Sequence, residues 1–186
     1  MLNINIKKLE IKTNEKKLVD ISFEIKDSTA LIGESGSGKS LTLKALLNLL
    51  PSSLEVKKDI DSNFELNYDS IGFIPQNPFT SLSMMTKITN QFFCDEKRKE
   101  EVLNLVCLDK NVLKKFPSQL SGGQIQRVVI AIALSRDIKI LLLDEPTTAL
   151  DEENKKNIID LINEIKKHLN ILILFVTHDI NSIQNI

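Results

Sequence analysis

The sequence of 186 residues contains no tryptophan, one tyrosine and only two cysteines, Cys94 and Cys107. Two cysteines are too few for a disulfide framework, and their spacing fits neither a zinc knuckle nor a redox pair. We therefore expect reduced cytosolic thiols, with Cys107 on an apolar helix face. Neither charge is in excess, because 24 basic residues stand against 25 acidic ones. This balance argues against a nucleic-acid partner and an anionic membrane surface, although it leaves a local basic patch open.

Long hydrophobic runs are also absent. The longest runs, such as ILILFV at 171–176, fall far short of the ~20 residues that cross a bilayer. The N-terminal stretch alternates apolar and polar residues and carries early lysines, which predicts a strand rather than a signal peptide. We therefore expect a soluble cytosolic protein that would serve a membrane only by docking to another protein. Apolar residues make up 42% of the chain, enough for one domain with a small attached lobe.

Apolar periodicity predicts strands that alternate with helices. Strict alternation predicts an antiparallel pair at 2–6 and 19–25, and short apolar runs predict buried strands at 29–33, 71–75, 138–144 and 171–176. Helices are predicted at 39–50, 96–108 and 152–169 and after Ser121, whereas 53–70 is weakly patterned and 77–95 looks irregular. This order indicates an α/β fold with a mainly parallel core.

The mostly helical segment 77–136 interrupts that alternation. We therefore predict a single domain, 1–186, in which 1–76 and 137–186 form the core and 77–136 forms an inserted helical lobe.

The stretch GESGSGKS matches the phosphate-loop pattern and lies between a predicted strand and a predicted helix. Glycines let backbone N–H groups close around phosphates. Lys39 would place its charge on the β- and γ-phosphates, and the Ser40 hydroxyl would bind Mg²⁺. A plain glycine turn explains the pattern far less well. We expect nucleotide contacts from Gly33, Glu34, Ser35, Gly36, Ser37, Gly38, Lys39, Ser40 and Leu41.

Further polar residues follow the other predicted buried strands. In ILLLDEP, Asp144 could hold Mg²⁺ through water, and Glu145 could orient or deprotonate an attacking water. His178 could contact a γ-phosphate, and Gln76 could contact Mg²⁺ or water. Each has a simpler explanation by itself, as a strand-ending carboxylate, a solvent-facing histidine or a surface glutamine. Gathered at one sheet edge with a phosphate loop, they predict a catalytic site.

LSGGQIQRVVIAIAL at 120–134 has the pattern of a second phosphate site. Ser121, Gly122 and Gly123 begin a predicted apolar helix, whose first N–H groups are unpaired and whose dipole is positive there. The chain already has a phosphate loop, so this pattern raises the question of which phosphate a second site would serve.

Together these motifs resemble the ATP-binding cassette (ABC) family. GESGSGKS is similar to its Walker A, Gln76 to its Q-loop, LSGGQ to its signature, ILLLDEP to its Walker B, TALD at 148–151 to its D-loop and His178 to its switch histidine. The resemblance implies a P-loop NTPase core with N-terminal antiparallel strands and an inserted helical lobe. It implies ATP and Mg²⁺ as cofactors. It also implies metal contacts from Ser40, Gln76 and Asp144 and catalytic roles for Gln76, Glu145 and His178.

In this family two cassettes pack head to tail, and the signature of one covers the γ-phosphate held by the Walker A of the other. The resemblance therefore implies contacts to the ATP of a second ATPase subunit, identical or a sister chain, from Ser121, Gly122, Gly123, Gln124 and Asp151. A bound γ-phosphate would join two surfaces that separate after hydrolysis.

QNPFTSL, after the strand at 71–75, resembles the importer subgroup for peptides and nickel. This implies an ATPase at the cytoplasmic face of the cell membrane, with membrane permease subunits as partners and an extracytoplasmic solute-binding protein acting indirectly. The alternatives are a non-transport cassette in DNA repair or translation, and a degenerate regulatory subunit. Between Lys39 and Ser121 there is no heptad run for a repair coiled coil, and no second cassette or basic linker is present. Intact Glu145 and His178 argue against degeneracy.

Three features depart from the family pattern. The only aromatic residue before Walker A is Phe23, in an alternating strand, so the usual adenine-stacking residue is missing. The turn at 27–29 reads Asp-Ser-Thr in place of the usual Gly-Glu. The chain stops at Ile186, soon after His178, where family members continue with further strands and a helix. We expect weak nucleotide affinity or base selectivity, and a missing portion that is absent or supplied by a partner.

Overall fold

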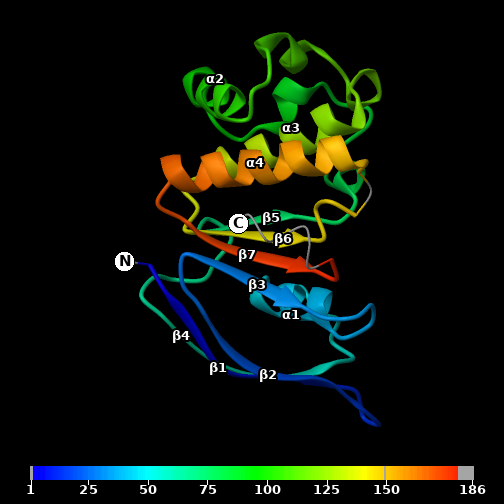
Figure 1. The fold of residues 1–186 in the computed structure, drawn as a ribbon, viewed down its shortest axis with the longest axis vertical. Helices are drawn as coiled ribbons and strands as arrows, with labels where there is room; N and C mark the ends of the chain where they lie inside the picture. Colours follow the sequence, from blue (N-terminus) through cyan, green and yellow to red (C-terminus); the bar gives the residue numbers. More distant parts are fainter. Residues whose placement is uncertain (1, 149, 180–186) are drawn as a thin grey trace.

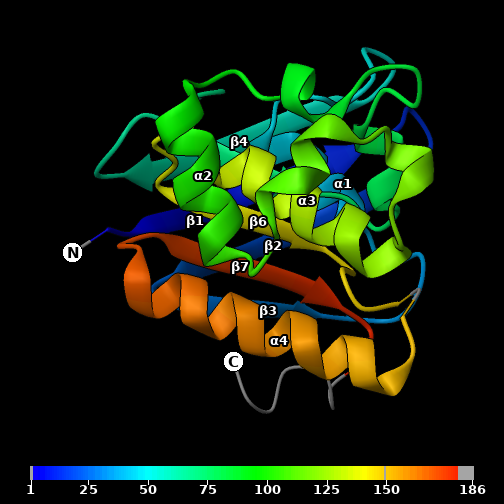
Figure 2. The same cartoon turned by 90° about the horizontal axis from the view of Figure 1, so that it is seen from above.

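The computed structural model describes residues 2–148 and 150–179. Their helices and strands are arranged in layers (Figure 1). Helices lie over one face of a parallel sheet, and a further helix and an antiparallel sheet lie against its other face (Figures 1 and 2). The predicted α/β fold with a mainly parallel sheet is therefore confirmed.

The antiparallel sheet contains β1 (Ile4–Lys12), β2 (Lys17–Ile25) and β4 (Glu55–Ser62), in the order β2-β1-β4. The predicted N-terminal pair is confirmed, with Ile11 opposite Val19 across β1 and β2. Both side chains are buried, because the apolar members of an alternating strand share one face.

The parallel sheet contains β3 (Ser28–Ile32), β7 (Leu172–Thr177), β6 (Ile140–Asp144) and β5 (Ile71–Ile74), paired in that order. Leu141 and Leu143 of β6 pack in the core shared with α3 and α4, whereas Ile140 and Leu142 pack in the core on the opposite face. Burial on both faces explains why β6 and β7 read as continuous apolar runs. All four strands run in the same direction, so their carboxyl ends meet at one edge.

The α-helices are α1 (Lys39–Leu46), α2 (Glu96–Leu105), α3 (Gly122–Leu134) and α4 (Glu152–His168). Between β5 and β6 the chain also forms the 3₁₀ helices η1 (Pro78–Ser81), η2 (Ile88–Gln91), η3 (Lys110–Lys114) and η4 (Pro117–Gln119). Helix α3 packs on β5, and α2 packs on α3 (Figure 1). None of the described helices has both the length and the apolar character that a bilayer crossing requires.

Two helices end earlier than the sequence predicts. Helix α1 ends at Leu46 rather than at residue 50, and Asn48 then adopts a left-handed conformation with φ of 57°. Helix α2 ends at Leu105, and Cys107 follows it with φ of 54° and an exposed side chain. The prediction that Cys107 lies on an apolar helix face is therefore wrong, because the helix has already ended.

The strand predictions also need two corrections. Strand β4 lies within the polar stretch 53–70, for which the sequence predicted no strand. Its side chains are nearly all exposed, so no regular alternation of apolar residues indicates it. Charged side chains face it from β1 instead, with Lys12 2.9 Å from Glu55. Strand β3, predicted to be buried, is partly exposed, and Ile32 is 45% exposed. Among the described strands β3 has one neighbour, β7, and is an edge strand.

Candidate functional site

The phosphate loop follows β3 at the carboxyl edge of the parallel sheet, and its last two residues, Lys39 and Ser40, begin α1. Gly36 and Gly38 have positive φ angles of 82° and 93°, which residues with side chains rarely adopt. At Gly38 an added Cβ would also lie 2.5 Å from Cγ2 of Val19, so the approach of β2 requires a glycine. The N–H of Gly33 donates to the carbonyl of Thr177 at 3.4 Å, which ties the loop to the end of β7.

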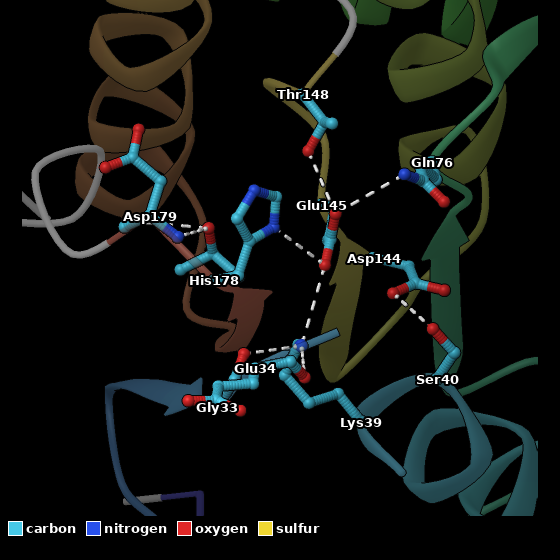
Figure 3. Close-up of polar contacts among 11 residues, drawn as sticks. Gly33, Glu34, Lys39, Ser40, Gln76, Asp144, Glu145, Thr148, His178 and Asp179 are labelled. Carbon is cyan, nitrogen blue, oxygen red and sulfur yellow. Dashed lines mark hydrogen bonds and ion pairs between the residues drawn. The ribbon is translucent and has the colours of Figure 1, made fainter. Parts of the chain in front are cut away.

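Lys39 is the first residue of α1, and only 7% of it is exposed. Its ammonium group donates to the carbonyls of Gly33 at 2.7 Å and Glu34 at 2.8 Å. The same nitrogen lies 3.6 Å from Oε1 of Glu145 (Figure 3). The loop therefore encloses a cation that points toward the end of β6.

Ser40 faces the last residue of β6, and its hydroxyl donates to Oδ1 of Asp144 at 3.0 Å. Burial raises the pKa of Asp144 above its usual value, and the Ser40 hydrogen bond opposes this rise only in part. A bound divalent cation would favour the ionised carboxylate. The pair presents two oxygens of the hard type that Mg²⁺ prefers.

The Glu145 carboxylate is surrounded by side chains from separate segments (Figure 3). Its Oε1 lies 3.1 Å from Nδ1 of His178, and its Oε2 accepts from the Gln76 amide at 3.3 Å and from the Thr148 hydroxyl at 3.0 Å. Burial opposes ionisation, but the hydrogen bonds from His178 and Thr148 and the charges of His178 and Lys39 outweigh it. The pKa of Glu145 is therefore lowered. The ionised carboxylate is the form that can accept a proton from water.

A cavity of about 250 Å³ lies beside the loop. Its lining residues are Ser35, Gly36, Gly38, Lys39, Ser40, Leu41, Gln76 and Glu145. Loop glycines, a buried ammonium and a hydroxyl next to a carboxylate suit the phosphates of a nucleotide with Mg²⁺. In the described part of the chain, no cluster of three or more His, Cys, Asp or Glu residues could hold a metal. A Mg²⁺ ion here would therefore need phosphate oxygens and water beside Ser40, Gln76 and Asp144.

The signature residues lie at the start of α3. The Ser121 hydroxyl accepts from the N–H of Gln124 at 3.3 Å, and the Gln124 side chain accepts from the N–H of Ser121 at 3.1 Å. This reciprocal pair is a capping box, which the Ser-x-x-Gln spacing favours. Ser121 and Gly122 are exposed, and an added Cβ at Gly122 would meet nothing within 4 Å.

Asp151 caps the start of α4 by accepting from the N–H of Asn154 at 2.9 Å. An added Cβ at Gly123 would lie 3.5 Å from Oδ1 of Asn154, so the starts of α3 and α4 are neighbours. None of the described residues 121–124 and 151 lines the cavity beside the phosphate loop. The structure brings together Lys39, Ser40, Gln76, Asp144, Glu145 and His178. Ser121, Gly123, Gln124 and Asp151 lie outside this group, whereas Gly122 lines a second cavity that Gln76 also lines.

Two contacts at the site were not predicted from the sequence. The first is the hydrogen bond from Thr148 to Glu145, because Thr148 was named from the sequence only as part of the TALD motif. The separation of three residues, which a turn can bridge, is the signal that could have indicated it. Gln126 is buried, and its amide donates to the carbonyl of Pro146. A polar residue on an otherwise apolar helix face is the signal that could have identified it.

Residues 17–148 match the model of the family described as ABC transporter. The chain belongs to this family. It is 36% identical over 197 residues to the oligopeptide transport ATP-binding protein OppD of Bacillus subtilis, in an alignment that covers 90% of this chain and 55% of OppD. The chain thus spans about half the length of this ABC relative.

Two solved ABC structures have closely similar folds. CbiO1 from Clostridium perfringens, part of the ABC transporter complex cbiONQ, matches with a TM-score of 0.79 and 25% identity over 97% of this chain and 80% of CbiO1. The ATP-binding cassette MJ0796, a dimer bound to ADP and Pi in a post-hydrolysis state, matches with a TM-score of 0.74 and 26% identity. That match covers 100% of this chain and 91% of MJ0796. The resemblance to ABC ATPases drawn from the motifs is therefore confirmed.

Proposed function

We propose that this chain binds and hydrolyses ATP with Mg²⁺ as the ATPase subunit of an ABC importer. The observation that carries the proposal is the meeting of Lys39 and Glu145, 3.6 Å apart, beside the cavity of a phosphate loop. A buried ammonium suits phosphate oxygens, and an ionised carboxylate beside it can orient a water molecule and accept its proton.

Each residue of the site has a distinct role in this proposal. The loop N–H groups and Lys39 bind the phosphates, for which Lys39 exchanges the carbonyls of Gly33 and Glu34 for phosphate oxygens. Glu145 orients the attacking water and accepts its proton, and His178, beside Glu145, contacts the γ-phosphate. Mg²⁺ would be held by Ser40, Gln76 and Asp144, and it would neutralise charge on the β- and γ-phosphates.

We further propose that the chain works as a head-to-tail dimer with an identical or sister subunit. The exposed Ser121 and Gly122, outside the lining of this chain's own phosphate cavity, suit contacts to a partner's ATP. Gly123, Gln124 and Asp151 belong to the same surface, because Gly123 neighbours Asn154 next to Asp151 on α4. The dimeric MJ0796 structure lends support to this arrangement.

The proposed importer carries a peptide or nickel-type solute, and the chain is peripheral at the cytoplasmic face of the membrane. The name of OppD supports a peptide, and CbiO1 supports assembly with other transporter components. Residues 77–136 form the helical lobe in this proposal, and its segment 77–95 contacts the permease. Four side chains there are at least 42% exposed, namely Phe79, Met84, Met85 and Phe93. Exposed methionine and phenylalanine suit an adaptable apolar interface.

The substitution Glu145→Gln tests the hydrolysis step, because glutamine keeps the size of the side chain and removes the base. We expect ATP affinity, measured by calorimetry, to persist and the turnover of ATP to fall at least ~10²-fold. Glu24→Gln is the control, because Glu24 is an exposed carboxylate on β2 that pairs with Lys26 at 2.8 Å. Full turnover by Glu145→Gln would reject Glu145 as the base, and no ATP binding by the unaltered chain would reject the function.

A further inference from the structure

In the turn after β6, the side chain of Thr148 holds the carboxylate of Glu145, which lies in the same turn. The Thr148 hydroxyl donates to Oε2 of Glu145 at 3.0 Å, and the N–H of Thr148 donates to the Glu145 carbonyl at 3.2 Å. One residue therefore closes the turn by its backbone and fixes the carboxylate by its side chain. The Thr148 side chain is exposed and has no part in the apolar core.

The two carboxylate oxygens of Glu145 have different surroundings (Figure 3). Oε2 faces Thr148 and the Gln76 amide, whereas Oε1 faces Lys39 at 3.6 Å and His178 at 3.1 Å. Lys39 also lines the cavity beside the phosphate loop. Gln76 lines this cavity too, so Oε1 is distinguished by its position beside the Lys39 ammonium, the group that would bind the phosphates, whereas Oε2 is held by an amide and a hydroxyl.

The Thr148 contact differs from the other contacts of Glu145 in its origin. The other three contacts come from distant segments: Lys39 lies on α1, Gln76 follows β5 and His178 follows β7. Each of these residues would gain a phosphate, metal or water contact when nucleotide binds. Thr148 lies in the same turn as Glu145, so its hydrogen bond can persist while the other three residues exchange partners. A carboxylate pinned by one oxygen loses rotational freedom and keeps the other oxygen directed at the reaction centre.

The backbone of Glu145 adds a reason for such a restraint. Its φ angle is +47°, which residues other than glycine adopt rarely and at a cost in free energy. The N–H of Glu145 donates to the carbonyl of Val176 at 2.8 Å, so the backbone is held from β7. This hydrogen bond holds the backbone and not the carboxylate, which Thr148 contacts separately.

We propose that Thr148 is a positioning residue that holds Oε2 of Glu145 so that Oε1 faces the water attacking ATP. This role rests on the proposed function, because it has meaning only if Glu145 acts on water at a bound nucleotide. Its action is on the rate of the chemical step and not on nucleotide affinity, since the hydroxyl points at Glu145 and Thr148 does not line the phosphate cavity.

Two substitutions separate positioning from a structural role of the turn. Thr148→Val keeps the branched shape and removes the donor, whereas Thr148→Ser keeps the donor and removes a methyl group. We expect Thr148→Val to lower kcat about tenfold, as for the loss of a hydrogen bond to a charged group, with KM for ATP unchanged within about twofold. We expect Thr148→Ser to retain most of the unaltered kcat.

The matched control is Thr29→Val at the amino end of β3. The Thr29 hydroxyl bonds the Lys26 carbonyl at 3.4 Å, also three residues back in a turn, at the opposite edge of the sheet from the phosphate loop. We expect its kcat to be unchanged. Crystal structures of the nucleotide-free Thr148 variants give a second readout. We expect Oε2 of Glu145 to move away from residue 148 in Thr148→Val and to keep its hydrogen bond to the hydroxyl in Thr148→Ser.

The outcomes distinguish this role from the function on which it rests. An unaltered chain that hydrolyses no ATP, alone or with the membrane proteins that co-purify with it, would reject the proposed function. Hydrolysis by the unaltered chain with equal kcat for Thr148→Val, or with equal losses for Thr148→Val and Thr148→Ser, would reject only the positioning role. An unmoved Glu145 carboxylate in the Thr148→Val crystal would also reject it.

Discussion

Ser40 and Asp144 lie 104 positions apart in the chain, yet the hydroxyl of Ser40 donates to Oδ1 of Asp144 at 3.0 Å. The contact joins the first turn of α1 to the last residue of β6. Both ends reach the same place because the parallel strands deliver their carboxyl ends to one edge of the sheet. The pair is therefore the metal-facing part of the proposed site.

Asp144→Asn tests this metal role. Asparagine can still accept the Ser40 hydrogen bond but lacks the negative charge, so we expect Mg²⁺ to tighten ATP binding about 10-fold less in the variant. Calorimetric affinities measured with Mg²⁺ and with a chelator give this difference. The control is Asp137→Asn, because Asp137 is a 92% exposed carboxylate just before β6, at the opposite edge. An unchanged effect of Mg²⁺ in Asp144→Asn would remove Asp144 from the metal site.

Gly38→Ala and Gly36→Ala separate steric from conformational demands of the phosphate loop. Both positions have positive φ, so each alanine costs roughly 1–2 kcal/mol of stability. At Gly38 the added Cβ would also lie 2.5 Å from Cγ2 of Val19, whereas an added Cβ at Gly36 would have no atom within 4 Å. We expect urea unfolding to give Gly38→Ala a further loss of about 1–3 kcal/mol. Equal losses would mean that β2 yields to the added methyl group.

The arrangement of the site could be predicted because its residues follow apolar strands. Asp144 ends β6 and Gln76 follows β5, and a parallel sheet brings such positions to one edge whatever their separation in sequence. The contact of Thr148 with Glu145 could not be predicted in this way. The turn that carries this contact begins at Glu145 with a positive φ, and glutamate is a residue type that does not signal that conformation.

Weak burial of its side chains explains why the sequence patterns missed strand β4. Strand β4 pairs with β1 by backbone hydrogen bonds while most of its own side chains are exposed, so no apolar alternation marks it. The end of α1 did carry a signal, because asparagine tolerates the left-handed conformation that Asn48 adopts. The end of α2 before Cys107 has no such signal in the residue type, since cysteine rarely adopts that conformation.

A crosslinking experiment tests the proposed contact of segment 77–95 with a membrane subunit. Ser83 is exposed beside Met84 and Met85, so a cysteine placed there should crosslink to a permease in membranes of the native cell. The native thiols Cys94 and Cys107 are first replaced, since Cys107 is exposed.

Ser22→Cys in the same background is the control, because Ser22 is exposed on β2 in the antiparallel sheet. We expect crosslinks to a membrane protein from position 83 and none from position 22. Products from neither position, or equal products from both, would mean that 77–95 does not face the permease and that its apolar side chains serve the lobe itself.

Gly122→Asp tests whether the signature serves the ATP of a partner. Gly122 is exposed and has free space around it, and a carboxylate in the first turn of a helix is favourable, so the variant should fold. Its own phosphate loop is unchanged, so we expect the monomer to bind ATP normally. The ATP-dependent dimer should fail, because the carboxylate would face a γ-phosphate in a desolvated interface. Gly122→Asn is the isosteric control without the charge.

Mixing Gly122→Asp with Lys39→Ala chains then tests the head-to-tail geometry. Lys39→Ala alone should lose Mg-ATP binding, because the ammonium enclosed by the loop is gone. In a mixed head-to-tail dimer, one composite site carries both defects and the other carries neither, so ATPase activity should return in part. If the signature served the ATP of its own chain, every site in the mixture would carry one defect and no activity would return. Loss of ATP binding by a folded Gly122→Asp monomer, with binding retained by Gly122→Asn, would refute the partner geometry, because the added carboxylate would then act on the nucleotide of its own chain.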